Sequence, residues 1–156
     1  MRVLVVDDDP SIRGLLAAQL GLEGHDVSVA PDGESARVEL AVTPYDAVVL
    51  DVMMPGMTGW ELLAWVRGEG GLDTPVVLLT ARDVADDVRR GYELGANAVM
   101  SKPYDFDELR LVLDRVTTEL ELINDAIVLP ADPARVPAPF PGRWSVDPQE
   151  TGTISG

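Results

Sequence analysis

The 156-residue chain contains no cysteine, only one histidine (His25) and only one lysine (Lys102). The lack of cysteine excludes disulfide bonds and thiol chemistry and fits a reducing compartment. No apolar run approaches the ~20 residues that a membrane-spanning helix needs. The chain starts with four apolar residues before three acids, which is unlike a signal peptide. We therefore expect a cytoplasmic protein.

Basic residues are also scarce. The chain has 27 acidic and 12 basic residues, a formal net charge of −15. Such a surface repels nucleic-acid backbones and anionic lipid headgroups. We therefore expect no direct nucleic-acid binding and no membrane association, whereas cation binding is favoured.

Five short apolar segments predict strands. Four are continuous and rich in valine, as in strands buried on both faces of a parallel sheet. The second alternates between apolar and polar residues, which suits an edge strand. The segments are residues 3–6, 27–30, 47–50, 76–79 and 98–100.

Helical patterns fill the intervals between these segments. Their start and stop signals are Asp9 (N-cap), Pro10 and Gly24 for the first helix, a Thr58/Glu61 capping box for the third, Gly95 as the end of the fourth, and an Asp105/Glu108 pair for the fifth. The second and fourth helices are expected over about 33–42 and 84–94. Five β-α units with short connections predict a doubly wound α/β fold, with ligands at the carboxyl ends of its strands.

The composition changes after residue 128, where six of the twelve prolines fall between Pro130 and Pro148. We expect a folded domain over 1–121, and a helix end followed by a disordered proline-rich tail over 122–156. Phe140 and Trp144 offer docking contacts within this tail, although a solvated extension is the simpler interpretation. The tail is too short and too rich in proline for an output domain.

Acidic residues follow two of the predicted strands. Asp7 and Asp8 end the first strand and Asp51 ends the third, so neighbouring parallel strands would bring the three carboxylates together. Their mutual repulsion is relieved by a hard divalent ion with oxygen ligands, Mg²⁺ by preference. The alternative is that Asp7 and Asp8 cap the next helix, but Asp9 alone suffices for that.

Two further polar residues end the fourth and fifth strands. Thr80 alone is weak evidence for a functional site, because threonine is common at strand ends. Lys102 places a compact ammonium, which acts as a point charge toward phosphate, in a chain whose other bases are all arginine. Chance is the alternative explanation for a single lysine at this position. The combination with the acids indicates a phosphate site.

The ordered set of motifs over residues 1–121 resembles the receiver domain of two-component response regulators. The matching motifs are Asp7-Asp8, the segment from Asp51 to Gly59, Thr80-Ala81 and Lys102-Pro103. The resemblance implies a flavodoxin-like (βα)5 fold with strand order 2-1-3-4-5. It also implies a stand-alone, non-enzymatic signalling module. Such a module receives a phosphoryl group from a sensor histidine kinase or phosphotransfer protein and signals to a protein partner.

The resemblance also implies a role for each matching residue. Asp51 would be the phosphoacceptor in a Mg²⁺-dependent reaction. The remaining roles are direct metal ligand for Asp8, water-mediated metal ligand for Asp7, a backbone carbonyl ligand from Met53, phosphoryl contacts from Lys102 and Thr80, and a small neighbour at Ala81.

Three positions depart from the family's pattern. Val99 stands where the family usually has an aromatic switch residue, and Tyr104 occupies a different family position. The signal is therefore expected to pass through the fourth helix or its loop. Asn97 and Ala98 replace acids common in receivers that form homodimers through the fourth helix, fifth strand and fifth helix, which weakens that expectation.

Arg82 and Met53 each lie two residues beyond a site residue. We hypothesise that they shield the acyl phosphate from water. The alternative for Arg82 is a surface ion pair with Asp83 or Asp86.

Two other functions stay open at this point. A haloacid-dehalogenase-like phosphatase would use Asp7 as its nucleophile, although the chain lacks that family's cap and late acidic motif. A pseudo-receiver would bind partners without being phosphorylated, and Val99 keeps this alternative open.

Overall fold

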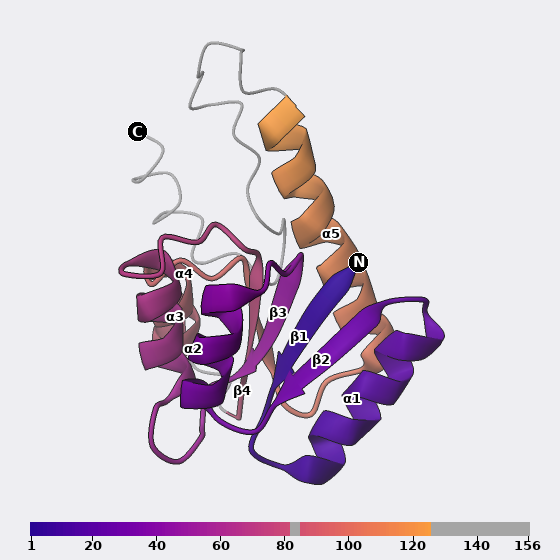
Figure 1. Ribbon diagram of the computed structural model, residues 1–156, viewed down its shortest axis with the longest axis horizontal. Coiled ribbons are helices and arrows are strands. Elements are labelled where there is room, and N and C mark those ends of the chain that lie inside the picture. Colours follow the sequence, from indigo (N-terminus) through magenta and orange to yellow (C-terminus); the bar gives the residue numbers. More distant parts are fainter. Residues whose placement is uncertain (82–84, 126–156) are drawn as a thin grey trace.

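Five parallel strands form a single sheet in the order β2-β1-β3-β4-β5 in the computed structural model, which describes residues 1–81 and 85–125. Five helices alternate with these strands (Figure 1). The strands are β1 (Arg2–Val6), β2 (Asp26–Ala30), β3 (Ala47–Asp51), β4 (Val76–Thr80) and β5 (Ala98–Ser101). The helices are α1 (Pro10–Leu22), α2 (Gly33–Val42), α3 (Gly59–Arg67), α4 (Ala85–Glu93) and α5 (Phe106–Asp125). The predicted doubly wound fold and strand order are confirmed.

The helices cover both faces of the sheet. In Figure 1, α2, α3 and α4 lie on one face of the sheet and α1 and α5 on the other. One hydrophobic core joins the sheet to α2, α3 and α4, and a second core joins its other face to α1 and α5. Every residue of β3 and β4 is buried, as the valine-rich segments predicted, because these central strands have helices on both sides. The edge strand β2 is only partly buried, which explains its alternating pattern.

Most helix boundaries follow the predicted signals. The Asp9 carboxylate accepts hydrogen bonds from the backbone of α1, and the Thr58/Glu61 capping box is present at α3. Gly24 has a φ of +90°, a left-handed conformation that favours glycine after a helix. Each strand is one residue longer than expected. β1 and β2 begin one residue earlier, and the other three end one residue later, so that Asp51, Thr80 and Ser101 are their last residues.

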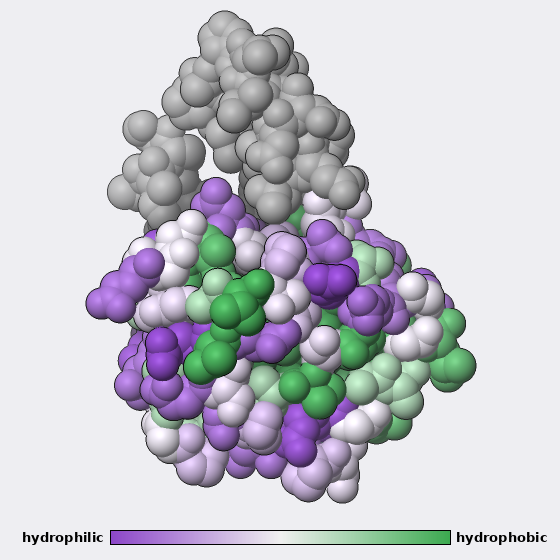
Figure 2. Space-filling view, in the orientation of Figure 1, coloured by the Kyte–Doolittle hydropathy of each residue, from purple (hydrophilic) through white to green (hydrophobic). Residues whose placement is uncertain are grey.

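Some expectations concern residues outside the described ranges. These are position 84 at the start of the fourth helix, Arg82, and the proline-rich tail with Phe140 and Trp144. Among the described residues, no helix combines the length and apolarity needed to cross a bilayer. On the face shown in Figure 2, hydrophobic residues form several small groups between hydrophilic ones.

At the amino end of the sheet, Arg67 connects α3 to the segments on either side of it. Its guanidinium donates hydrogen bonds to the Gly95 carbonyl (3.0 Å), the Leu72 carbonyl (2.8 Å) and Asn97 Oδ1 (2.9 Å). Asn97 Oδ1 also accepts from the Val76 backbone N–H at 2.9 Å. Asn97, which the sequence presented only as a missing acid, is therefore an acceptor that joins the starts of β4 and β5.

Candidate functional site

The strand register brings the polar strand ends together. Val6 of β1 is level with Leu50 of β3, so the next residues, Asp7 and Asp51, lie side by side at the edge of the sheet. On the other side of β3, the end of β4 at Thr80 is level with Ser101 of β5. The carboxyl ends of four strands therefore meet at one edge of the sheet, where open α/β sheets bind ligands.

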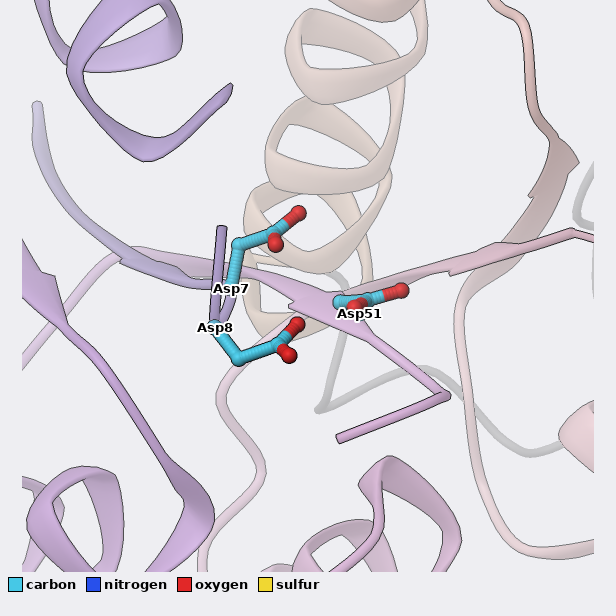
Figure 3. A group of neighbouring side chains, drawn as sticks. All are labelled: Asp7, Asp8 and Asp51. Atoms are coloured by element: carbon cyan, nitrogen blue, oxygen red, sulfur yellow. The ribbon is translucent and has the colours of Figure 1, made fainter. Parts of the chain in front are cut away.

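Asp7, Asp8 and Asp51 form a carboxylate cluster at this edge (Figure 3). One oxygen from each lies within 4.8 Å of the others. Asp7 and Asp51 are 1% and 3% exposed, whereas Asp8 is exposed. The sequence prediction that these three side chains converge is confirmed, while their individual roles stay predictions.

Asp7 is held through several of its polar atoms. Its Oδ1 accepts a hydrogen bond from the Asp9 backbone N–H at 2.9 Å, and its Oδ2 lies 3.4 Å from Lys102 Nζ. Its backbone carbonyl accepts a hydrogen bond from Arg13 Nη1 at 2.8 Å. Asp9, not Asp7, accepts the hydrogen bonds that cap α1. The capping alternative for Asp7 therefore does not apply.

Lys102 forms an ion pair with Asp51, with 3.0 Å between Nζ and Oδ1. Burial and the charges of Asp7 and Asp8 raise the pKa of the Asp51 carboxyl, although Lys102 lowers it. Burial lowers the pKa of the Lys102 ammonium, but its contacts with Asp51 and Asp7 outweigh burial and raise it overall. Lys102 therefore stays charged at neutral pH, and the pocket favours extra positive charge near Asp51.

The cluster fits a hard divalent cation. Its three carboxylates supply the oxygen ligands that Mg²⁺ prefers. The ammonium of Lys102 balances only one of the three negative charges, and the raised pKa of Asp51 reflects first its burial and then the charges of Asp7 and Asp8. Asp7, Asp8 and Asp51 thus form an acidic triad that suits Mg²⁺.

The segment after β3 is fixed by a close backbone approach. The Gly59 N–H donates to the Val52 carbonyl at 2.9 Å, and a Cβ at Gly59 would lie only 2.5 Å from the Asp51 carbonyl oxygen. Gly56 turns the chain with a φ of +73°. Met53 lies between these points with 65% of its surface exposed. The Met53 backbone therefore belongs to a loop that is held at Val52 and at Gly59.

The remaining predicted site residues differ in their surroundings. Thr80 is buried at 2% exposure, and its carbonyl accepts a hydrogen bond from the Lys102 backbone N–H at 2.7 Å. Ala81, beside it, is exposed. Burial and the charges of Asp7 and Asp51 raise the pKa of Tyr104 to about 12, so this phenol stays protonated near the pocket.

Sequence reasoning missed two residues near the cluster. Arg13 contacts the Asp7 carbonyl from the first turns of α1, and Gly59 admits the Asp51 backbone at the start of α3. The signal for Arg13 was a base four residues after the N-cap Asp9, on the helix that follows the acids. Gly59 belongs to the motif that follows Asp51, but the sequence alone assigns it no role.

The fold and the site together define a class of protein. It is a parallel α/β domain with an acidic pocket and a lysine at the carboxyl edge of its sheet. The family described as response regulator receiver domain matches residues 3–114, and the chain belongs to this family. Receiver domains partner with histidine kinases and are not enzymes apart from their own phosphorylation chemistry. The family assignment rules out the phosphatase alternative.

Several relatives and solved structures are similar to this chain. It is 44% identical over 109 residues to the transcriptional regulatory protein TcrA of Mycobacterium tuberculosis, covering 70% of this chain and 43% of that protein. It is 38% identical over 124 residues to the transcriptional regulatory protein DltR of Streptococcus agalactiae, covering 80% and 55%. The receiver domain of the Francisella response regulator 1452 aligns with a TM-score of 0.73 and 32% identity, covering 76% of this chain and 98% of that one. The Vibrio cholerae chemotaxis protein CheY4 aligns with a TM-score of 0.70 and 34% identity, covering 74% and 97%. The chain thus spans about half the length of these curated relatives.

Proposed function

We propose that this receiver domain accepts a phosphoryl group on Asp51 from a phosphohistidine of a sensor kinase or phosphotransfer protein. The observation that carries the proposal is the environment of Asp51. Its carboxylate is buried, lies 3.0 Å from the Lys102 ammonium, and shares a pocket with Asp7 and Asp8. A nucleophilic carboxylate at the rim of a crevice suits attack on phosphorus.

The chain's own groups suit the transfer. An Asp51 carboxylate oxygen forms the new bond to phosphorus as the bond from phosphorus to the donor nitrogen breaks, and the donor imidazole leaves. Lys102 is placed to pair with a phosphoryl oxygen, because the charge spread over these oxygens must be stabilised during transfer. Thr80, at the end of β4, would then contact the phosphoryl group.

Asp8 and Asp51, with Asp7 through a water molecule and the Met53 carbonyl, would hold Mg²⁺. When bound, Mg²⁺ would neutralise charge on the transferring phosphoryl group. Arg82 and Met53 would shield the product from water. An acyl-phosphate lifetime unchanged by Arg82→Ala would refute that last role.

The phosphorylated pocket would signal to a downstream protein partner. A phosphoryl group adds about −1.5 to −2 charges at neutral pH, which favours rearrangement of the loops after β3 and β4. Because Val99 replaces the usual aromatic, we propose that the signal passes to α4. A homodimer through α4, β5 and α5 is a weaker proposal. A cytoplasmic location and a receiver domain over 1–121 complete the proposal.

Phosphorylation can be tested with small donors. The full chain is incubated with Mg²⁺ and phosphoramidate, whose phosphorus–nitrogen bond resembles that of phosphohistidine. The acyl phosphate is trapped by borohydride reduction and its position is mapped by peptide mass spectrometry. We expect modification at Asp51 that requires Mg²⁺.

Two variants make the test specific. Asp51→Asn should abolish the modification, whereas Asp114→Asn, at an exposed position on α5, should leave it unchanged. Absence of modification in the wild-type chain, with Mg²⁺ and donor in excess, would support the pseudo-receiver alternative and refute the proposal.

A further inference from the structure

Arg13 reaches back from α1 to the segment that carries the acids. Its backbone N–H donates to the Asp9 carbonyl at 2.9 Å, as expected within the first turn of the helix. Its guanidinium Nη1 donates to the Asp7 carbonyl at 2.8 Å, and the side chain is half-buried. The helix that follows the acids is thus tied to the backbone between them.

The Asp7 carbonyl belongs to the peptide unit that joins Asp7 to Asp8. This unit is planar, so fixing its oxygen fixes the direction in which the chain enters Asp8. The amino side of Asp7 is held because its N–H donates to the Ala30 carbonyl at 3.3 Å, and beyond Asp8 the Asp9 N–H donates to Asp7 Oδ1. Arg13 adds a restraint on the peptide unit that lies between these two contacts.

Asp8 depends on this backbone more than Asp7 does. The Asp7 carboxylate contacts both Asp9 and Lys102, whereas within residues 1–81 and 85–125 the Asp8 carboxylate accepts no hydrogen bond. The Asp8 side chain is also exposed, so little packing restrains it. Its convergence with Asp7 and Asp51 therefore rests on the orientation of the peptide unit that Arg13 holds.

We propose that Arg13 is a positioning residue that aims the Asp8 carboxylate at the pocket and so strengthens divalent-cation binding. The proposal rests on the metal site named under the proposed function. The charge of Arg13 acts in the opposite direction, because a guanidinium near the pocket repels a cation. Positioning and charge thus predict changes of opposite sign when Arg13 is replaced.

The size of the effect follows from other metal sites. Removing a group that orients a metal ligand typically weakens metal binding about 10- to 100-fold. The loss of the repelling charge offsets part of this in Arg13→Met, which removes the donor and the charge but keeps an unbranched side chain. We expect the Mg²⁺ dissociation constant to rise roughly tenfold, at the lower end of that range.

The experiment measures Mg²⁺ binding directly by isothermal titration calorimetry on the full chain. Arg2→Met serves as the matched control, since Arg2 lies at the opposite end of β1 in an exposed ion pair with Asp26. Arg13→Lys retains the charge and one donor group, so its dissociation constant should fall between those of wild type and Arg13→Met. Arg2→Met should remain within about twofold of wild type, because distant surface charges are screened.

An unchanged or smaller Mg²⁺ dissociation constant in Arg13→Met would overturn the proposal. A smaller one would show that Arg13 acts only through its charge. Circular dichroism checks that each variant is folded, and Arg13→Gln, with the same expected direction, replaces Arg13→Met if the latter does not fold.

The Mg²⁺ concentration for half-maximal phosphorylation should rise by the same factor, while the rate at saturating Mg²⁺ recovers. If Asp51 is not phosphorylated at all, the proposed function fails, but the calorimetry still decides the role of Arg13. A wild-type chain that binds no Mg²⁺ would overturn both the metal site and this inference.

Discussion

Gly59→Ala is the substitution that should most directly disturb both the fold and the site. A Cβ at Gly59 would lie 2.5 Å from the Asp51 carbonyl oxygen and 2.7 Å from the Val52 Cα. Both atoms are backbone, so neither moves away by a side-chain rotation. The Val52 N–H is also bonded to the Leu79 carbonyl at 3.0 Å, which ties this backbone to β4. The added methyl group therefore has to displace α3 or the end of β3.

The expected cost combines two terms. Overpacking in a well-packed interior costs about 1–3 kcal/mol, and the upper end applies here because the contacts are with backbone atoms. Alanine is about 0.5–1 kcal/mol better than glycine within a helix, which offsets part of that cost. The net loss should be about 2 kcal/mol. Domains of this size have unfolding free energies of about 5–15 kcal/mol, so the loss is readily measured.

Gly14→Ala is the matched control. Gly14 lies within α1 and a Cβ there would meet no atom within 4 Å, so only the helix preference acts. This variant should gain about 0.5–1 kcal/mol. Urea unfolding followed by circular dichroism at pH 7 measures both variants. A Gly59→Ala protein as stable as wild type would refute the packing argument. Where the added methyl group displaces the end of β3, the Asp51 backbone moves, so Gly59→Ala should also slow phosphorylation.

Three further predictions concern the site and the helices around it. Because burial and neighbouring carboxylates raise the pKa of Asp51, its contribution to stability is full below pH 3.8 and is lost as the pH rises through the raised pKa. Asp51→Asn should therefore unfold at a higher temperature than wild type at pH 7 without Mg²⁺, and this advantage should shrink at pH 4. Arg90 Cζ lies 4.5 Å from the centre of the Trp60 ring. A double-mutant cycle with Arg90→Met and Trp60→Leu should therefore give a coupling free energy of about 0.5–1 kcal/mol. A coupling near zero would exclude a cation–π contribution. Arg67→Met leaves the Gly95 and Leu72 carbonyls without this donor, and Asn97 Oδ1 keeps only the Val76 N–H. The substitution should cost about 3 kcal/mol in urea unfolding, against less than about 1 for Arg37→Met at an exposed ion pair. Equal losses would contradict the half-buried, multiply bonded role of Arg67.

The elements and the acid cluster were predictable because both depend on local patterns. Four of the five strand segments were continuous apolar runs, and helix starts carried capping residues that act within three positions of each other. Parallel strands place their carboxyl ends at one edge, so residues directly after a strand converge whatever the loops do. This is why Asp7, Asp8 and Asp51 were found from position alone.

Contacts made by long side chains across elements were not predictable in the same way. Arg13 and Arg67 each reach a backbone carbonyl whose position depends on how a helix crosses the sheet. Many rotamers of arginine are compatible with the sequence, and only packing selects one. The close approach at Gly59 likewise depends on the path of the loop after β3, which no periodicity specifies.

The position of Val99 shows how one departure from the family pattern changes the packing around it. Val99 is 1% exposed, and a Cβ at Gly91 of α4 would lie 2.6 Å from its Cγ2 and 3.1 Å from Leu78 Cδ1. The backbone of α4 therefore lies directly on β4 and β5 at this point, and a larger residue at position 99 would have to displace the helix. Trp60, beside Gly91, is the second residue of α3, the helix whose first residue, Gly59, lies against the Asp51 backbone. A displacement at Asp51 would thus reach α4 through packed neighbours, so we expect the signal to travel by helix packing and not by rotation of an aromatic ring.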